Sequence, residues 1–471
     1  MNSSSDFVGL SITELNAGYK NKQFSPVDVA QAFLQRIDDT NKEMNAYITV
    51  THDTALEAAK RAEDAFMHEQ THNYLQGIPV AVKDLMDTKG ARTTYGSTMF
   101  DQHIPDQDAA VVERLKEAGA IILGKTNTDA FAFGVTTENP YYGAVKNPWR
   151  EGHVTGGSSG GSSAAVSAGL ATAALGSDTA GSVRIPAACC GIVGLKPSAG
   201  RVSRRGVMPL SWSLDHVGLL ARSAQDAALL LAAIAGPDSK DPLTLELMPL
   251  GDWQESLFAG IRIGVPTNWF FDHIDPEIEA IVQNAIRSME KLGSHIIPVE
   301  IAHTEQYFFV FSSIGRAEAA FAHDFLWARK DEYLEGFREF LEDGRSIDAM
   351  HFIDASRERE RIRGGLVSLF DEVDLIVSPT MPMKTPEYSQ PEFILGAHRE
   401  DTHNALMRLM YPFNLSGHPA ASIPCGTTKE GLPVGLQMAG HLGEDWKVLG
   451  LAAAWLADNP FEMQKQRSDP L

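Results

Sequence analysis

The sequence predicts an α/β fold built around a large β-sheet. Two short runs, 77–84 (GIPVAVKD) and 120–125 (AIILGK), are apolar and rich in β-branched residues, as buried strands are. The segment between them, 108–119 (DAAVVERLKEAG), has helical spacing and ends at a glycine. A strand, a helix and a second strand in this order, with both strands apolar throughout, predict parallel pairing through a right-handed crossover.

The other elements follow from start signals and periodicity. A helix is expected over 25–38, because Ser25 can cap it, Pro26 suits its first position and apolar residues recur at helical spacing. Small residues after position 160 predict a helix that is buried on all sides. Further helices are expected over 53–67, 223–235, 275–291 and within 305–372, and further strands over 261–266, 373–380 and after Pro424.

These elements divide the chain into four parts. We expect an N-terminal helical segment packed on the core, a core that carries the reactive residues, a helical insertion that shapes a substrate pocket, and a C-terminal part that completes the sheet. The corresponding ranges are 1–75, 76–235, 236–372 and 373–471.

Composition excludes several classes of protein. The chain has 471 residues, 44% of them hydrophobic, and a formal net charge of −21 without a Lys/Arg-rich run, so nucleic acid is not an expected partner. Its three cysteines, Cys189, Cys190 and Cys425, do not form a disulfide framework, which favours a reducing compartment. Neither a signal peptide nor an apolar stretch of about 18 residues is recognisable, so a cytoplasmic protein without membrane contact is expected.

The stretch HVTGGSSGGSSAAV, residues 153–166, allows two interpretations. Gly/Ser tracts commonly connect domains as flexible coil. Here, however, the tract lies inside the α/β core and leads directly into a small-residue helix, which favours a functional loop. Residues 156–160 also match the G-x-S-x-G pattern with Ser158 at its centre, but the preceding residues do not resemble the strand that an α/β-hydrolase requires.

A second pattern, HEQTH at residues 68–72, matches the H-E-x-x-H zinc motif. His68 and His72 would bind the metal and Glu69 would act as base. No third ligand is evident, so a polar helix end with two surface histidines is the better interpretation. We therefore expect no metal.

The strongest constellation combines Lys83 with Ser158 and Ser182. The two serines lie in loops that flank one buried helix, so both can reach the same end of it. Burial among apolar residues would lower the pKa of Lys83 from about 10.4 and let it act as a base near neutral pH. The competing interpretation is a strand-end lysine paired with the neighbouring Asp84.

At this point a family resemblance emerges. The chain resembles the amidase signature family in GIPVAVKD, GAIILGKTN, FGVTTENPYYGAVKNPW, GGSSGGS, GSDTAGSVRIPAACCGIVGLKP and PFNLSGHPAASIPCG. Ser158 follows Lys83 by 75 residues and Ser182 follows Ser158 by 24, as in the family. The resemblance implies a large, mixed, mostly parallel sheet covered by helices on both faces.

The resemblance also implies roles for these residues. Ser182 would be the nucleophile, Lys83 the base, and Ser158 a proton relay that follows a cis Gly157–Ser158 bond. The residues expected to form the oxyanion hole through their backbone N–H groups are Thr179, Ala180, Gly181 and Ser182; Ala180 stands where many members have glycine. Ser159 would orient Lys83 or Ser158, and Asp178 and Arg184 would brace the loop. No cofactor is implied.

The first half resembles the glutamine-hydrolysing component of glutamyl-tRNA amidotransferase, but Tyr411, Pro412 and Phe413 replace an acidic stretch of that protein. Ala132 and Phe133 match the family's substrate-facing loop, together with Ser158. We therefore expect a stand-alone hydrolase of a small-molecule amide, with esters or carbamates as further substrates. The alternatives are a glutamine-hydrolysing subunit of a tRNA-dependent amidotransferase and a catalytically silent assembly subunit. Assembly into a homodimer is an open option.

Overall fold

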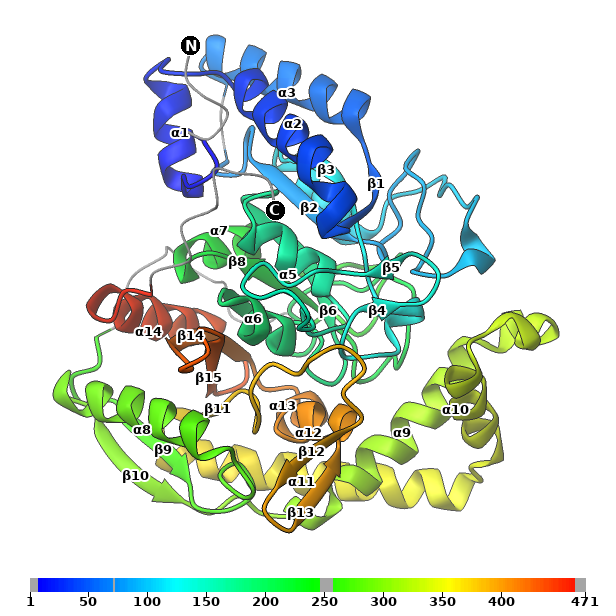
Figure 1. The fold of residues 1–471 in the computed structure, drawn as a ribbon, viewed down its shortest axis with the longest axis vertical. Helices are drawn as coiled ribbons and strands as arrows, with labels where there is room; N and C mark the ends of the chain where they lie inside the picture. The colour runs from blue at the N-terminus through cyan, green and yellow to red at the C-terminus, as the bar shows by residue number, and fades with distance from the viewer. Residues whose placement is uncertain (1–6, 71–72, 246–256, 462–471) are drawn as a thin grey trace.

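The computed structural model describes residues 7–70, 73–245 and 257–461. The predicted helix near residue 25 is confirmed as α2 (Pro26–Met44), and Ser25 and Asp28 form the expected reciprocal cap at its start. The predicted helix at 53–67 is confirmed as α3 (His52–Met67). Together with α1 (Ile12–Lys20), these helices form the N-terminal part of the chain, drawn blue in Figure 1.

The predicted strand–helix–strand unit is also confirmed. Strand β2 (Pro79–Lys83) pairs in parallel with β3 (Ile121–Thr126), and α4 (Ala110–Glu117) connects them. On its other side β2 pairs in parallel with β6 (Ala173–Asp178), so the carboxyl ends of β2 and β6 meet at one edge of the sheet. This is the edge at which open α/β sheets commonly bind their ligands.

The whole sheet has eleven strands in the order β1-β3-β2-β6-β8-β7-β14-β15-β11-β9-β10, which confirms the predicted α/β fold with a large mixed sheet. Parallel pairs lie toward its two ends. The middle is antiparallel from β6 through β15 to β11, which the short apolar runs of the sequence did not indicate. The strands not yet placed are β1 (Tyr47–Val50), β7 (Val193–Lys196), β8 (His216–Ala221), β9 (Arg262–Pro266), β10 (His295–Val299), β11 (Leu375–Pro379), β14 (Ala420–Thr427) and β15 (Pro433–Gly440).

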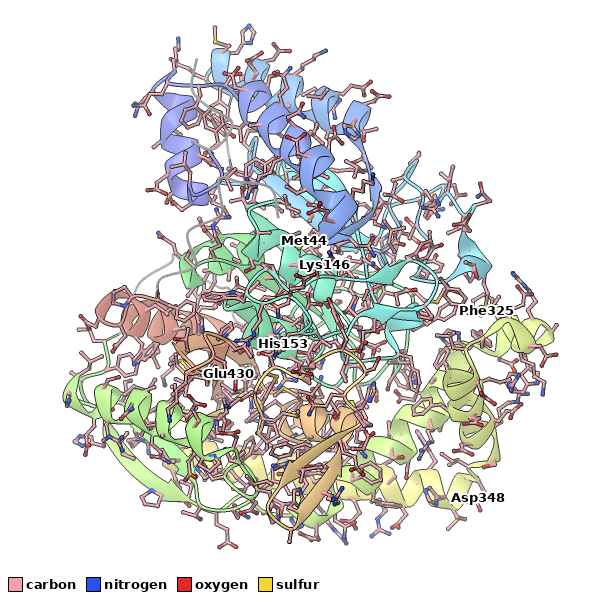
Figure 2. The ribbon with its side chains drawn as sticks, viewed as in Figure 1. Met44, Lys146, His153, Phe325, Asp348 and Glu430 are labelled. Atoms are coloured by element: carbon pink, nitrogen blue, oxygen red, sulfur yellow. The ribbon has the colours of Figure 1, made fainter. Side chains whose placement is uncertain are left out.

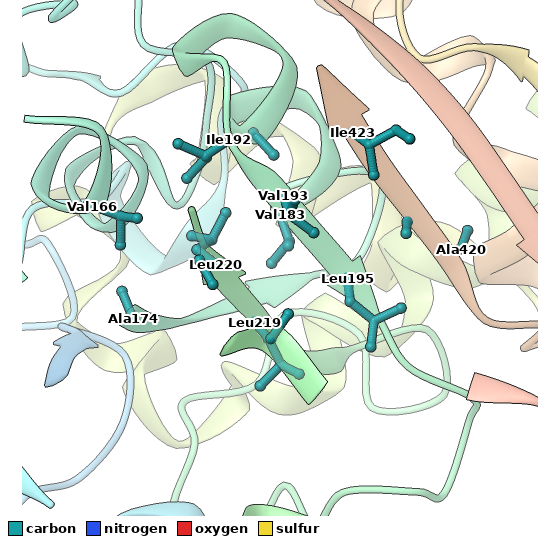
Figure 3. Close-up of a cluster of buried hydrophobic side chains, with 14 of the residues drawn as sticks. Val166, Ala174, Val183, Ile192, Val193, Leu195, Leu219, Leu220, Ala420 and Ile423 are labelled. Atoms are coloured by element: carbon teal, nitrogen blue, oxygen red, sulfur yellow. The ribbon is translucent and has the colours of Figure 1, made fainter. Parts of the chain in front are cut away.

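Helices cover both faces of this sheet. Helices α5 (Gly160–Ser167) and α6 (Arg184–Cys190) are buried throughout and contact each other and the central strands, while α7 (Ala224–Ile234) packs on α14 (Asp445–Asp458). Figure 3 shows how the core forms: Val166 of α5 and Val183 before α6 lie beside Leu220 of β8. The near-absence of large side chains on α5 permits this close packing, as predicted.

A helical arm extends from the core. It consists of α9 (Tyr307–Ala322), α10 (Glu335–Ser346) and α11 (Ala349–Glu372), and it lies at one side of the molecule in Figure 1. Phe325 and Asp348 mark its outer edge in Figure 2. Figure 2 also labels Met44 and Lys146, whose backbone N–H to O bond of 3.0 Å joins the end of α2 to the following loop region.

The remaining elements are short or peripheral. They are α8 (Pro276–Lys291), α12 (Thr402–Arg408), α13 (Tyr411–Ser416), the hairpins β4 (Glu138–Asn139) with β5 (Gly143–Ala144) and β12 (Glu392–Leu395) with β13 (His398–Asp401), and single 3₁₀ segments at Thr98–Phe100, Ala130–Ala132, Thr304–Gln306 and Asp324–Glu332. Among the described residues, none of the helices is long and apolar enough to cross a membrane. Cys189, Cys190 and Cys425 are free thiols.

Candidate active site

Lys83 ends the buried strand β2, and its side chain is completely buried. Its Nζ lies 2.7 Å from Ser158 Oγ, 3.0 Å from Ser159 Oγ and 2.9 Å from Ser177 Oγ. Ser158 and Ser159 come from the loop before α5, and Ser177 comes from β6. The structure therefore brings Lys83 and Ser158 into direct contact across 75 positions of sequence.

The alternative pairing of Lys83 with Asp84 is wrong. Successive residues of a strand point to opposite sides, so the Asp84 side chain turns away from Lys83. Asp84 instead lies 3.4 Å from the ammonium of Lys125, which is equally buried. Lys125 also donates hydrogen bonds to the Met86 carbonyl at 2.6 Å and to Thr93 Oγ1 at 2.8 Å.

Burial without a directly paired carboxylate favours the neutral form of the Lys83 amine. It lowers the pKa of Lys83 to about 7, although the charges of Asp129, Asp178 and Asp215 oppose the shift. A lysine with a pKa in this range is substantially neutral at physiological pH and can accept a proton. The geometry thus provides the lowered pKa that the sequence predicted.

The Gly/Ser tract is a fixed loop rather than a connector. The Gly157–Ser158 peptide bond is cis, as expected from the family resemblance. Thr137 clamps the loop, because its hydroxyl donates to the Gly156 carbonyl at 3.0 Å and accepts from the Gly160 N–H at 3.1 Å. A Cβ on Gly157 would lie 2.4 Å from Asp129 Oδ2, so only glycine fits here.

The second serine loop lies against the first. The Ser159 N–H donates to the Ser182 carbonyl at 3.1 Å, which joins the two loops through their backbones. Ser182 is 4% exposed, and within the described part of the chain its hydroxyl makes no hydrogen bond. The structure therefore places Lys83, Ser158 and Ser182 in one contiguous site at the carboxyl edge of β2 and β6.

Asp178 and Arg184 support the loop of residues 179–182 from inside. The two side chains are fully buried, and Arg184 donates to Asp178 through both Nε, at 3.0 Å, and Nη2, at 2.9 Å. Burial alone would raise the pKa of Asp178, but the charge and hydrogen bonds of Arg184 hold it below its ordinary value. Asn414 Nδ2 adds a further bond to Asp178 Oδ1 at 2.9 Å.

The backbone N–H groups of the loop differ from one another. The Gly181 N–H donates to Asp178 Oδ1 at 2.8 Å and is therefore already engaged. The N–H groups of Thr179, Ala180 and Ser182 form no hydrogen bond to any residue that the structure describes. Of the four donors expected for an oxyanion hole, these three are the ones available to a ligand.

A cavity of about 270 Å³ borders this loop. Ser177 and Thr179 line it, together with Ala132 from the predicted substrate-facing segment. Most of its remaining wall is apolar, including Leu85, Val207, Met208, Pro209 and Leu210. Such a cavity suits a ligand with an apolar or aromatic group near the loop.

Phe133 occupies a different position from Ala132. Its ring packs on Phe337 and Phe340 of α10, with centroid distances of 4.8 and 4.9 Å, in a cluster that links the helical arm to the core. Phe133 does not line the described cavity. The Phe131 ring is buried in the same cluster.

Tyr411 and Phe413 are core residues. Tyr411 stacks on Phe311 at a centroid distance of 4.5 Å, and Phe413 packs near Phe270 at 5.9 Å. Both are almost completely buried, and neither lines the cavity beside the loop. Their apolar character thus reflects packing, and the neighbouring Met410 is the residue that approaches Gly181.

The zinc pattern receives no support from the described residues. His68 is exposed and its Nδ1 lies 2.8 Å from the Asp64 carbonyl, whereas His72 lies outside the described residues. Across 7–70, 73–245 and 257–461, the structure contains no group of three side chains suited to a metal ion.

Sequence reasoning missed Ser177, Asp129 and Asp215. Ser177 is the third hydroxyl at Lys83, and Asp129 and Asp215 are the carboxylates whose charges reach it along with that of Asp178. Ser177 and Asp215 belong to motifs that the sequence displays, GSDTAGS and SLDHVG. Only the pairing of β6 with β8 brings these motifs together.

Comparison with known proteins agrees with this geometry. A family model described as Amidase matches residues 28–449. Among curated relatives, the glutamyl-tRNA(Gln) amidotransferase protein of Chromohalobacter salexigens, the first of the enzyme's lettered components, is 40% identical over 94% of this chain and 95% of its own length.

Two solved structures show the fold. That of the corresponding Thermotoga maritima amidotransferase component has a TM-score of 0.81 at 31% identity and covers 97% of this chain and 96% of its own. That of a bacterial aryl acylamidase of the amidase signature enzymes has a TM-score of 0.90 at 25% identity and covers 98% and 99%.

Proposed function

This chain belongs to the amidase signature family of hydrolases that act on C–N bonds, and from that premise we propose that it hydrolyses a small-molecule carboxylic amide through an acyl-enzyme on Ser182. Lys83 is the base in this proposal, and Ser158 relays the proton between Lys83 and Ser182. The observation that carries the proposal is the buried Lys83, whose only close polar neighbours among the described residues are three serine hydroxyls.

The arrangement of protons around Lys83 supports the relay. A neutral amine has two N–H groups and one lone pair, so one of the three hydroxyls must donate to it. Ser159 already lies 3.2 Å from the Ser177 carbonyl, to which its hydroxyl donates, so it can only accept from Lys83. Ser158, the closest of the three at 2.7 Å, is well placed to donate its proton to the amine.

The reaction then proceeds in two acyl-transfer steps. The Ser182 Oγ attacks the carbonyl carbon, its proton passes to Ser158, and the Ser158 proton passes to Lys83. The N–H groups of Thr179, Ala180 and Ser182 stabilise the oxyanion, and such donors are typically worth about 3 kcal/mol each. The C–N bond breaks as the relay returns a proton to the leaving amine, and water subsequently hydrolyses the ester to Ser182.

The apolar cavity favours an amide with an apolar or aryl group as the substrate. Esters and carbamates present an acyl carbon in the same way, so we include them in the proposal. Residues 236–372 contribute α10, whose Phe337 packs against the loop that carries Ala132 and Phe133, and in our proposal this segment shapes the mouth of the pocket. We place the enzyme in the cytoplasm.

A second function is supported at least as strongly by the relatives. Two glutamyl-tRNA(Gln) amidotransferase components, from Chromohalobacter salexigens and Syntrophus aciditrophicus, are 40% and 37% identical to this chain over 94% and 97% of its length. The same Ser182 chemistry would then release ammonia from glutamine within a larger complex. The silent-subunit hypothesis is less favoured, because Lys83, Ser158 and Ser182 are all present.

A substrate panel separates these functions. Anilides, aliphatic amides, aryl esters, carbamates and L-glutamine are incubated with the wild type and with Ser182→Ala, and released amine, acid or ammonia is measured. We expect turnover of the apolar amides alone, with Ser182→Ala slower by more than about a thousandfold. Glutamine as the best substrate, with turnover that rises when partner subunits are added, would instead establish the amidotransferase function.

A further inference from the structure

Asp215 and Thr179 face each other just beyond the end of a strand pair. In the antiparallel pair of β6 and β8, the last residue of β6, Asp178, is opposite the first residue of β8, His216. Thr179 and Asp215 are the next residues outward. The Thr179 hydroxyl donates to Asp215 Oδ1 at 2.6 Å, which closes the gap between the oxyanion loop, residues 179–182, and the segment before β8.

Asp215 itself is firmly anchored. Its second carboxylate oxygen, Oδ2, accepts hydrogen bonds from the backbone N–H groups of Leu210 at 2.9 Å and Ser211 at 3.0 Å. Its own carbonyl accepts from Arg204 Nη1 at 3.2 Å. The carboxylate therefore bridges a backbone segment on one side and the Thr179 hydroxyl on the other.

The oxyanion loop is otherwise held at its far end. Asp178 accepts from the Gly181 N–H, and the Ser182 carbonyl accepts from Ser159. The Thr179 end borders the cavity of about 270 Å³, so packing on that side is incomplete. Within the described residues, the bond to Asp215 is the hydrogen bond that fixes the Thr179 side chain.

We propose that Asp215 is a positioning residue, which holds the oxyanion loop in its productive shape through the Thr179 hydroxyl. This inference rests on the proposed Ser182 chemistry. In this role Asp215 does not exchange protons with the substrate. It keeps the N–H groups of Thr179 and Ala180 directed toward the point where the oxyanion forms, and a displacement of about 1 Å in such a group can cost about a hundredfold in rate.

Substitutions on both sides of the bond test the proposal. Thr179→Val removes the hydroxyl and keeps the shape, whereas Thr179→Ser restores the hydroxyl. Asp215→Asn keeps the size of the side chain, but an amide cannot accept at both ends, so one end loses its bond. The double variant Asp215→Asn/Thr179→Val reveals whether the two side chains act together. Asp241→Asn alters another carboxylate at the same cavity that does not contact Thr179.

The readout is the second-order rate of labelling by a fluorophosphonate probe, followed by kcat and KM on the substrate that the panel identifies. We expect Thr179→Val and Asp215→Asn each to slow labelling by about ten- to a hundredfold, with the loss in kcat rather than KM. The double variant should be no slower than the slower single variant, Thr179→Ser should recover most of the rate, and Asp241→Asn should react like the wild type.

Thermal unfolding of each variant shows whether it is folded. Wild-type labelling at Ser182 combined with an unchanged rate in Thr179→Val would overturn the positioning role and leave the proposed function intact. Additive losses in the double variant would also overturn it. Absence of labelling at Ser182 in the wild type would instead refute the proposed function itself.

Discussion

The pH dependence of kcat/KM is the most informative property of this site. Burial lowers the pKa of Lys83 to about 7, and the neutral amine is the form that can accept the Ser182 proton through Ser158. The neutral fraction of such a group is about 90% at pH 8 and about 9% at pH 6. We therefore predict that kcat/KM falls about tenfold from pH 8 to pH 6 and is level above pH 8.

Initial rates on a neutral amide or ester, measured from pH 5.5 to 10, provide the assay. A lysine of ordinary pKa would be only about 0.3% neutral at pH 8, and its rate would still rise about tenfold per pH unit there. A rate that climbs in this way between pH 8 and 10 would refute the argument from burial.

Asp129→Asn assigns the inflection to Lys83. The negative charge of Asp129 raises the pKa of Lys83, so its removal should move the inflection to lower pH. The exposed Asp53→Asn is the matched control and should leave the profile unchanged. An inflection that stays in place or moves to higher pH in Asp129→Asn would assign it to another group.

The remaining predictions concern the loop, the buried ion pair and metals. Gly181 has φ +102, and a Cβ there would lie 2.3 Å from Met410 Cγ, so Gly181→Ala should abolish labelling by a fluorophosphonate, whereas Gly364→Ala, in open space, should not. Arg184→Met strands the buried Asp178 and should lower the free energy of unfolding in urea by about 3–5 kcal/mol, against about 0–1 kcal/mol for the exposed Arg345→Met. Incubation with a chelator should leave turnover unchanged, because side chains supply both nucleophile and base; a loss that zinc restores would contradict this.

Local patterns predicted much of the site. The apolar run before Lys83 indicated a buried strand, and the small residues after the Gly/Ser tract indicated a buried helix; both are present as β2 and α5. These two features place the Lys83 and Ser158 side chains at the same end of the core. The contact of 2.7 Å between them is the result of that placement.

Long-range partners could not be predicted in the same way. The choice of Lys125 rather than Lys83 as the partner of Asp84 depends on which side of the sheet each side chain faces. Likewise, Tyr411 and Phe413 read as pocket residues in the sequence, but α13 turns both rings into the core. The Thr179–Asp215 bond depends on the register of β6 with β8, which apolar periodicity does not determine.

The most direct test of the central claim is the location of the covalent adduct. The purified protein is treated with a fluorophosphonate probe, digested and analysed by mass spectrometry, with Ser182→Ala and Ser158→Ala in parallel. The account predicts one adduct, on Ser182, which is absent from Ser182→Ala and forms more slowly in Ser158→Ala. An adduct on Ser158, or full labelling of Ser182→Ala, would contradict it.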